Sequence, residues 1–209
     1  MHRLYGYKNS GSAAVEIALE MAGVPWELIE AASWNEATAL GELEKFNPLK
    51  QIPTLVTDEG SVLTESAAIM INLGLAYPDS GLLPPEAVAR GQVVRGLVYI
   101  AANCYSVISI IDFPARYLPD ADEEEQARLV AGAKARLHHH WDIFADQFPG
   151  SPFLGGAQPG GLDILAAVVS KWSGTRKHLR SSRPAFYRLL RRIEEYPVVH
   201  AVFARHWPS

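Results

Sequence analysis

The chain has 209 residues, of which 48% are hydrophobic and 20% are charged, and its formal net charge is −4. This composition is typical of a globular protein with one large or two small domains, and the charge gives no reason to expect nucleic acid or an anionic membrane as a partner. The single cysteine, Cys104, excludes an intramolecular disulfide and a cysteine-rich zinc site. Because residues 1–12 lack the apolar stretch of a secretory signal, we expect a cytoplasmic protein.

The first part of the chain alternates between strand and helix patterns. From Ser12 onward, apolar residues recur at helical spacing until Gly23 and Pro25 end the pattern. Strands are expected on either side of this helix, and the predicted elements are strand 2–7, helix 12–22, strand 26–31, an irregular helix within 33–46, hairpin strands 53–57 and 61–64, and helix 66–77. This β-α-β-α-β-β-α order predicts a small mixed sheet with helices packed on it.

The rest of the chain shows helical patterns only. Residues 78–85, "PDSGLLPP", have the composition of a linker. Apolar periodicity then predicts helices over 86–116, 122–148, 161–174, 184–195 and 198–206. We therefore expect an α/β domain over residues 1–77, a linker over 78–85 and an all-helical domain over 86–209.

Three segments carry a family resemblance that spans nearly the whole chain. They are "LYGYKNSGSAAVEIALEMAGVPWE", "NPLKQIPTLVTDEGSVLTESAAI" and "FLGGAQPGGLDILAA". In order and spacing they resemble signature blocks of the cytosolic glutathione transferases. The resemblance implies a thioredoxin-like first domain, a C-terminal helical-bundle domain, and a homodimer that conjugates the thiolate of glutathione to hydrophobic electrophiles. Glutathione-dependent cis–trans isomerisation and a non-catalytic binding module of the same fold are the alternatives.

The central block suggests how glutathione would be held. Pro53 stands at the start of a strand, where a trans proline is the ordinary interpretation, but the resemblance implies a cis bond after Ile52. The backbone of Ile52 would then pair with the peptide as an added strand does. The resemblance further assigns the γ-glutamyl end to the strand–helix junction and the glycyl carboxylate to the preceding loop, which gives as binding residues Lys50, Gln51, Ile52, Pro53, Glu65 and Ser66.

The group that activates the thiol is the least determined feature. Ser10 occupies the position of the catalytic serine in the theta, delta and zeta classes, and Ser12 and Tyr7 are the alternatives, with Asn9 or backbone groups behind them. Gly11 stands where the beta class places a cysteine, so the resemblance favours a serine-type enzyme. A hydroxyl at the start of the first helix could stabilise a thiolate.

The helical domain contains candidates for the co-substrate site and for a helix cap, and a run of histidines. Aromatic residues of the helical domain are candidates for the hydrophobic co-substrate site, namely Tyr105, Phe113 and Trp172. Asp163 resembles the acidic residue of the family's helix-capping motif, but Gly160 stands at the cap position, so we expect Asp163 to bind backbone donors and to serve folding. Adjacent histidines in "LHHHW" point about 100° apart on a helix, so no metal site is expected there.

Overall fold

Four short strands and three helices form the first part of the chain in the predicted order. In the computed structural model, which describes residues 1–208, these elements are β1 His2–Gly6, α1 Ser12–Ala22, β2 Trp26–Glu30, α2 Leu40–Phe46, β3 Thr54–Val56, β4 Val62–Leu63 and α3 Ser66–Ala76. The strand order is β2-β1-β3-β4, with β1 parallel to β2 and antiparallel to β3. The predicted mixed sheet is confirmed.

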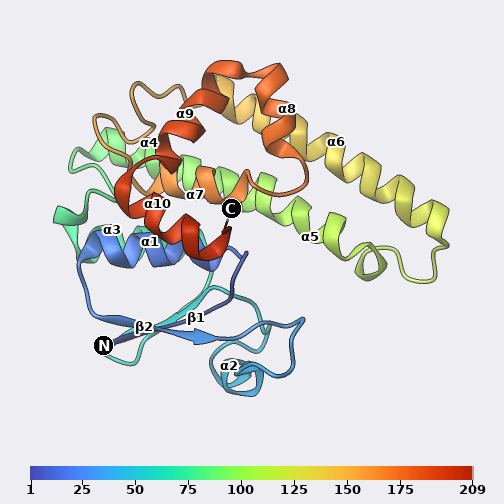
Figure 1. Ribbon diagram of the computed structural model, residues 1–209, viewed down its shortest axis with the longest axis horizontal. Coiled ribbons are helices and arrows are strands. Elements are labelled where there is room, and N and C mark those ends of the chain that lie inside the picture. The colour runs from blue at the N-terminus through green and yellow to red at the C-terminus, as the bar shows by residue number, and fades with distance from the viewer. Residues whose placement is uncertain (209) are drawn as a thin grey trace.

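Helices cover both faces of the sheet (Figure 1). Helices α1 and α3 lie side by side on one face, and α2 lies on the other. Under α2 is a small cluster of buried side chains around Tyr5, Leu43 and Val56. The larger core lies on the α1 side, where Val15 and Ile17 are packed into the same cluster as side chains of the helical domain.

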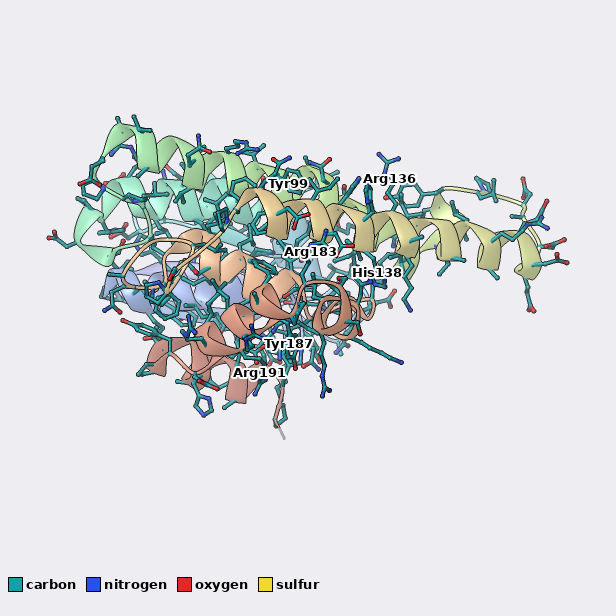
Figure 2. All side chains as sticks on the ribbon, turned by 90° about the horizontal axis from the view of Figure 1, so that it is seen from above. Tyr99, Arg136, His138, Arg183, Tyr187 and Arg191 are labelled. Carbon is teal, nitrogen blue, oxygen red and sulfur yellow. The ribbon has the colours of Figure 1, made fainter. Side chains whose placement is uncertain are left out.

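The second part of the chain is helical throughout its ordered elements. These are α4 Ala87–Tyr99, a π-helical segment Ile100–Tyr105, α5 Ser106–Asp112, a short 3-10 turn Pro114–Arg116, α6 Glu123–Gln147, α7 Gly161–Val169, α8 Thr175–Ser182, α9 Pro184–Glu194 and α10 Pro197–His206. Helix α4, the π-helical segment and α5 follow one another without a break and lie along α6 (Figures 1 and 2). In Figure 2 Tyr99 lies beside α6, where its hydroxyl donates a 3.0 Å hydrogen bond to the His140 carbonyl.

The structure corrects the predicted helices after residue 160. Helix α7 ends at Val169 instead of near residue 174, and the separate helix α8 was not predicted. Only Thr175 and Leu179 of α8 are buried, so the apolar repeat that reveals a helix is missing from its sequence. The helix is held instead by polar contacts with α6, since His178 lies 3.0 Å from the Asp142 carboxylate.

The two groups of elements are joined by a segment that is packed into the structure. Leu82 and Leu83 in the predicted linker are buried, and the Leu82 carbonyl accepts a 2.8 Å hydrogen bond from the Gly161 amide. The two parts of the chain also meet at α10, where Nε2 of His206 lies 2.6 Å from the carboxylate of Glu16 on α1. Helix α1 therefore lies between the sheet and the helical domain.

Within residues 1–208, one helix has the length and hydropathy of a membrane span. It is the continuous helix Ala87–Asp112, with a mean hydropathy of 1.5 in its most apolar part. Several of its apolar side chains, including Leu97, Ile100 and Cys104, are buried in the core of this fold. Such a helix is equally typical of the interior of a helical domain.

Candidate functional site

A cleft of about 440 Å³ is lined by residues of both parts of the chain. The first part contributes the loop after β1, the loop before β3 and the start of α3, and the second contributes the π-helical segment, α5 and the turn that follows it. Most of the residues predicted for the site line this cleft: Ser10, Lys50, Gln51, Ile52, Pro53, Glu65, Ser66, Tyr105, Phe113 and Trp172. The fold thus gathers residues that are far apart in sequence.

The loop before β3 has the expected backbone. The Ile52–Pro53 peptide bond is cis, which confirms the prediction made from the resemblance. Asn47, which is buried, holds the loop from within, because its side-chain amide donates 3.0 Å hydrogen bonds to the Gln51 carbonyl and the Thr54 hydroxyl. This role of Asn47 was not predicted, although the residue opens the motif that contains Pro53.

The junction between β4 and α3 presents free backbone donors to the cleft. The amides of residues 66–68 lie in the first turn of α3 and have no intrahelical acceptor; the first helical bond runs from Ile69 N–H to the Glu65 carbonyl at 2.9 Å. Glu65 has φ 64°, a conformation that residues with a side chain rarely adopt. Backbone strain of this kind clusters at ligand sites and could not be predicted from the sequence.

The loop after β1 uses its hydroxyl groups internally. Oγ of Ser10 donates a 2.7 Å hydrogen bond to the Tyr7 carbonyl and lies 2.9 Å from Oγ of Ser12. Ser12 is fully buried, and neither Ser12 nor Tyr7 lines the cleft. The Tyr7 hydroxyl instead accepts a hydrogen bond from the Asn35 amide at 3.2 Å. Of the candidates for the thiol activator, Ser10 and Asn9 line the cleft, whereas Ser12 and Tyr7 do not.

The side of the cleft formed by the helical domain is less apolar than expected. Tyr105 packs on Trp172 with ring centroids 6.2 Å apart, and the Arg116 guanidinium lies 4.0 Å from the centroid of the Phe113 ring. Four further residues with polar groups line this side, the unpredicted Ser106, Ser109 and Asp112 and the aromatic Tyr117. The unpredicted side chains gave no signal in the sequence because the end of α5 combines apolar and polar residues.

Burial changes the titration of two groups in the cleft. It raises the pKa of Tyr105 to about 12, and the negative charges of Asp112 and Glu65 add to this rise. Burial also raises the pKa of Asp112 above its usual value. Cys104 follows the same rule outside the cleft, because burial strongly raises the pKa of its thiol and makes the thiolate inaccessible at neutral pH.

Asp163 lies apart from the cleft and is fully buried. Its carboxylate accepts hydrogen bonds from three backbone N–H groups, those of Leu154 and Gly155 at 2.7 Å and that of Gly160 at 3.0 Å. Gly160 has no side chain to return a bond, as the sequence predicts. The contacts with residues 154 and 155 were not predicted, and they join the preceding loop to α7.

No group of three or more metal-binding side chains gathers within residues 1–208. The histidines of the "LHHHW" segment bind separate partners. His138 Nε2 lies 3.1 Å from the Ser173 carbonyl, and His140 Nδ1 lies 2.6 Å from the Asn103 carbonyl. The described residues that line the cleft carry hydroxyl, carboxylate, amide and cationic groups, the last on Lys50 and Arg116.

Comparison with known proteins identifies the family. Residues 12–74 match the family model for the glutathione S-transferase N-terminal domain. The chain is also 30% identical over 174 residues to an uncharacterized GST-like protein, YncG, of Escherichia coli strain K12, with 82% of each protein covered. The chain belongs to the glutathione transferase family.

Two further proteins resemble this glutathione transferase family member. A probable maleylacetoacetate isomerase of Caenorhabditis elegans is 39% identical over 101 residues, which cover 48% of this chain and 46% of the relative. A glutathione transferase homologue from Sulfitobacter, solved with bound glutathione, superimposes with a TM-score of 0.83 at 20% identity and 98% coverage of both chains. At this identity the second match shows the fold alone, a thioredoxin-like domain followed by a helical domain.

Proposed function

We propose that this member of the family binds glutathione and adds its thiolate to electrophilic carbon atoms. The observation that supports this most is the cleft itself, which brings the cis Ile52–Pro53 edge and the N-terminus of α3 to the same space. Glutathione is an extended peptide with two carboxylates and one ammonium group. A site that combines a backbone edge, free amide donors and charged side chains suits this molecule.

The γ-glutamyl end is assigned to the start of α3. Its carboxylate would accept from the free amides of residues 66–68 and from the Ser66 hydroxyl, where the helix dipole favours an anion. Its ammonium group would pair with the Glu65 carboxylate. The cysteinyl backbone would pair with Ile52, and this orientation directs the thiol toward the start of α1 and the helical domain.

The glycyl carboxylate is assigned to Lys50 and Gln51. Nζ of Lys50 lies 2.9 Å from the Glu44 carboxylate in the free protein, and both side chains are about half exposed. An ion pair of this exposure contributes only about 0–1 kcal/mol, so Lys50 can exchange Glu44 for the ligand at little cost. Gln51 is exposed and can supply an amide donor.

The reaction needs a thiolate at neutral pH. A free thiol has a pKa of about 8.5, and lowering it by about two units takes about 2.7 kcal/mol of preferential stabilisation of the anion. Ser10 remains the candidate that the sequence proposes for this role. The electrophile would lie against Phe113 and Trp172, where a sulfur lone pair forms the new C–S bond and the leaving group departs with its electron pair.

Glutathione-dependent cis–trans isomerisation is the second candidate. It is favoured by the similarity to the probable maleylacetoacetate isomerase and by Arg116, a cation on the cleft that could hold an acidic substrate. The start of α1 argues against it, since residues 14–16 contain no basic side chain. In that reaction the thiolate adds to a double bond and is expelled again after rotation, so no conjugate accumulates.

Titration calorimetry with glutathione tests the proposed binding mode. Glu65→Gln should weaken binding at least about tenfold, because a charge-assisted hydrogen bond contributes about 1.5–3 kcal/mol. Glu59→Gln is the matched control, since Glu59 is exposed in the β3–β4 turn and does not line the cleft. Absence of binding by the wild type at millimolar glutathione would refute the proposal.

Assays with an aryl halide and with a cis unsaturated diacid, each in the presence of glutathione, separate the remaining possibilities. Conjugation with halide release supports the transferase, and conversion of the diacid without loss of glutathione supports the isomerase. Binding without either activity would indicate a non-catalytic module. The proposal also includes a cytoplasmic homodimer that binds neither nucleic acid nor membranes, and sedimentation equilibrium measures the oligomeric state.

A further inference from the structure

The hydroxyl of Tyr105 occupies the space that a side chain at residue 11 would take. A Cβ atom built on Gly11 would lie 2.1 Å from Oη of Tyr105 and 3.1 Å from its Cζ. The first distance is too short for real atoms, and the second is tighter than most real Cβ contacts. Any side chain at position 11 would therefore displace the phenol. Tyr105 thus brings a hydroxyl from the helical domain to Gly11, the N-cap residue of α1.

The position of Tyr105 is set by its own element and its neighbours. It is the last residue of the π-helical segment Ile100–Tyr105, and segments of this kind are frequent at functional sites. Its ring packs on Trp172 and lies against the main core, so the side chain is half-buried and held at the cleft. The hydroxyl is consequently fixed toward the start of α1.

The hydroxyl groups near the start of α1 differ in what they can donate. The proton of Ser10 Oγ is directed to the Tyr7 carbonyl at 2.7 Å, and Ser12 closes the same network. By contrast, the Tyr105 hydroxyl has no hydrogen-bond partner among residues 1–208, although it lines the cleft. A hydroxyl has one proton to donate, and near the start of α1 the phenol proton of Tyr105 is free for a ligand.

The electrostatics of the cleft keep that proton on the phenol. Burial raises the pKa of Tyr105 to about 12, and the carboxylates of Asp112 and Glu65 raise it further in the same direction. At neutral pH the side chain is therefore an uncharged O–H donor. A donor of this kind stabilises an anion that it faces without adding a charge of its own.

We propose that Tyr105 is the catalytic residue that donates a hydrogen bond to the sulfur of bound glutathione. The inference rests on the proposed function, because the thiol is placed here by the binding mode assigned above. The thiol loses its proton to solvent, the phenol keeps its own proton, and the thiolate is held by the Oη–H bond. The sulfur lone pair then forms the C–S bond while the leaving group departs with the electron pair of the bond that breaks.

Tyr105→Phe removes only the hydroxyl and provides the test. The thiol pKa of bound glutathione, measured from the ultraviolet absorbance of the thiolate against pH, should rise by about one to two units, as loss of a hydrogen bond to a charged group implies. Affinity for S-methylglutathione, which has no ionisable thiol, should stay within about twofold. Tyr99→Phe is the matched control, since its hydroxyl binds the His140 carbonyl outside the cleft.

Two further variants keep the test decisive. Gly11→Ala retains the phenol but displaces it. Because Gly11 has helical dihedral angles, the alanine adds no backbone strain. This variant should therefore raise the thiol pKa as Tyr105→Phe does. Ser10→Ala tests the donor that the sequence proposes, and the inference requires a smaller rise of the thiol pKa in this variant than in Tyr105→Phe. A raised pKa in Ser10→Ala together with an unchanged pKa in Tyr105→Phe would overturn the inference.

The outcomes also separate this inference from the proposed function. If the wild-type protein binds no glutathione, the proposed function is wrong and the inference falls with it. If the protein binds glutathione and Tyr105→Phe leaves the thiol pKa unchanged, the inference alone is wrong. Circular dichroism of each variant establishes that the folded protein is being compared.

Discussion

Replacing Asp163 with alanine tests whether one buried carboxylate holds the loop before α7 in place. The side chain is fully buried and accepts hydrogen bonds from the amides of Leu154, Gly155 and Gly160. Alanine removes both carboxylate oxygens and with them all three hydrogen bonds. The amides then either remain unpaired or draw water into the loop, and both outcomes destabilise the folded state relative to the unfolded chain.

The size of the effect follows from these contacts. A buried donor left without a partner costs about 1–3 kcal/mol, and three fully buried donors would cost more. Two effects reduce the loss here. Leu154 and Gly155 are only half-buried, and removal of Asp163 relieves the burial of a charge. We therefore expect a net loss of about 3 kcal/mol in the free energy of unfolding. For a chain of this length, that corresponds to a fall in Tm of about 6–12 °C.

Thermal unfolding followed by circular dichroism measures this fall, with Asp79→Ala, an exposed residue of the linker, as the control. Glutathione affinity measured well below Tm should be the same for Asp163→Ala and the wild type, because Asp163 does not line the cleft. An unchanged Tm would refute the folding role. A weakened affinity in the folded variant would show that Asp163 acts on the site as well.

Two further predictions concern the buried carboxyl groups of Asp163 and Glu16. Burial raises the pKa of Asp163 to about 6, above its value of about 3.9 in an unfolded chain, so its titration contributes stability that is fully present below about pH 4 and is lost as the pH rises through about 6. Because asparagine does not titrate, unfolding in urea should show a larger stability difference between wild type and Asp163→Asn at pH 5 than at pH 7. A smaller difference at pH 5 would mean that the backbone donors lower the pKa of Asp163 more than burial raises it. Glu16→Ala should lower the free energy of unfolding by about 1–3 kcal/mol, since it leaves both ring nitrogens of the buried His206 without a partner. A thermal-unfolding curve that coincides with that of the wild type would contradict this role of the Glu16–His206 pair.

The two parts of the site differ in how far they could be predicted. The predicted binding residues of the first domain lie in two short segments, around Ile52 and around Ser66, and the motifs that contain them implied the cis bond before Pro53 but not the positive φ of Glu65. Tyr105 was recognised as a cleft residue but was assigned to the apolar side. Its approach to Gly11 depends on how the helical domain packs on α1, and no local pattern contains that information.

Local sequence patterns predicted the strands and helices of residues 1–77, because each element depends on neighbours within a few residues, and the cis bond before Pro53 was implied by the resemblance to the glutathione transferases. The tertiary structure decided which polar groups meet. Helix α8 exists through its contacts with α6, Glu16 is buried because His206 reaches it from α10, and the hydroxyl facing the start of α1 comes from Tyr105. These contacts join residues that are distant in the chain, and only the packing of one domain on the other fixes their geometry.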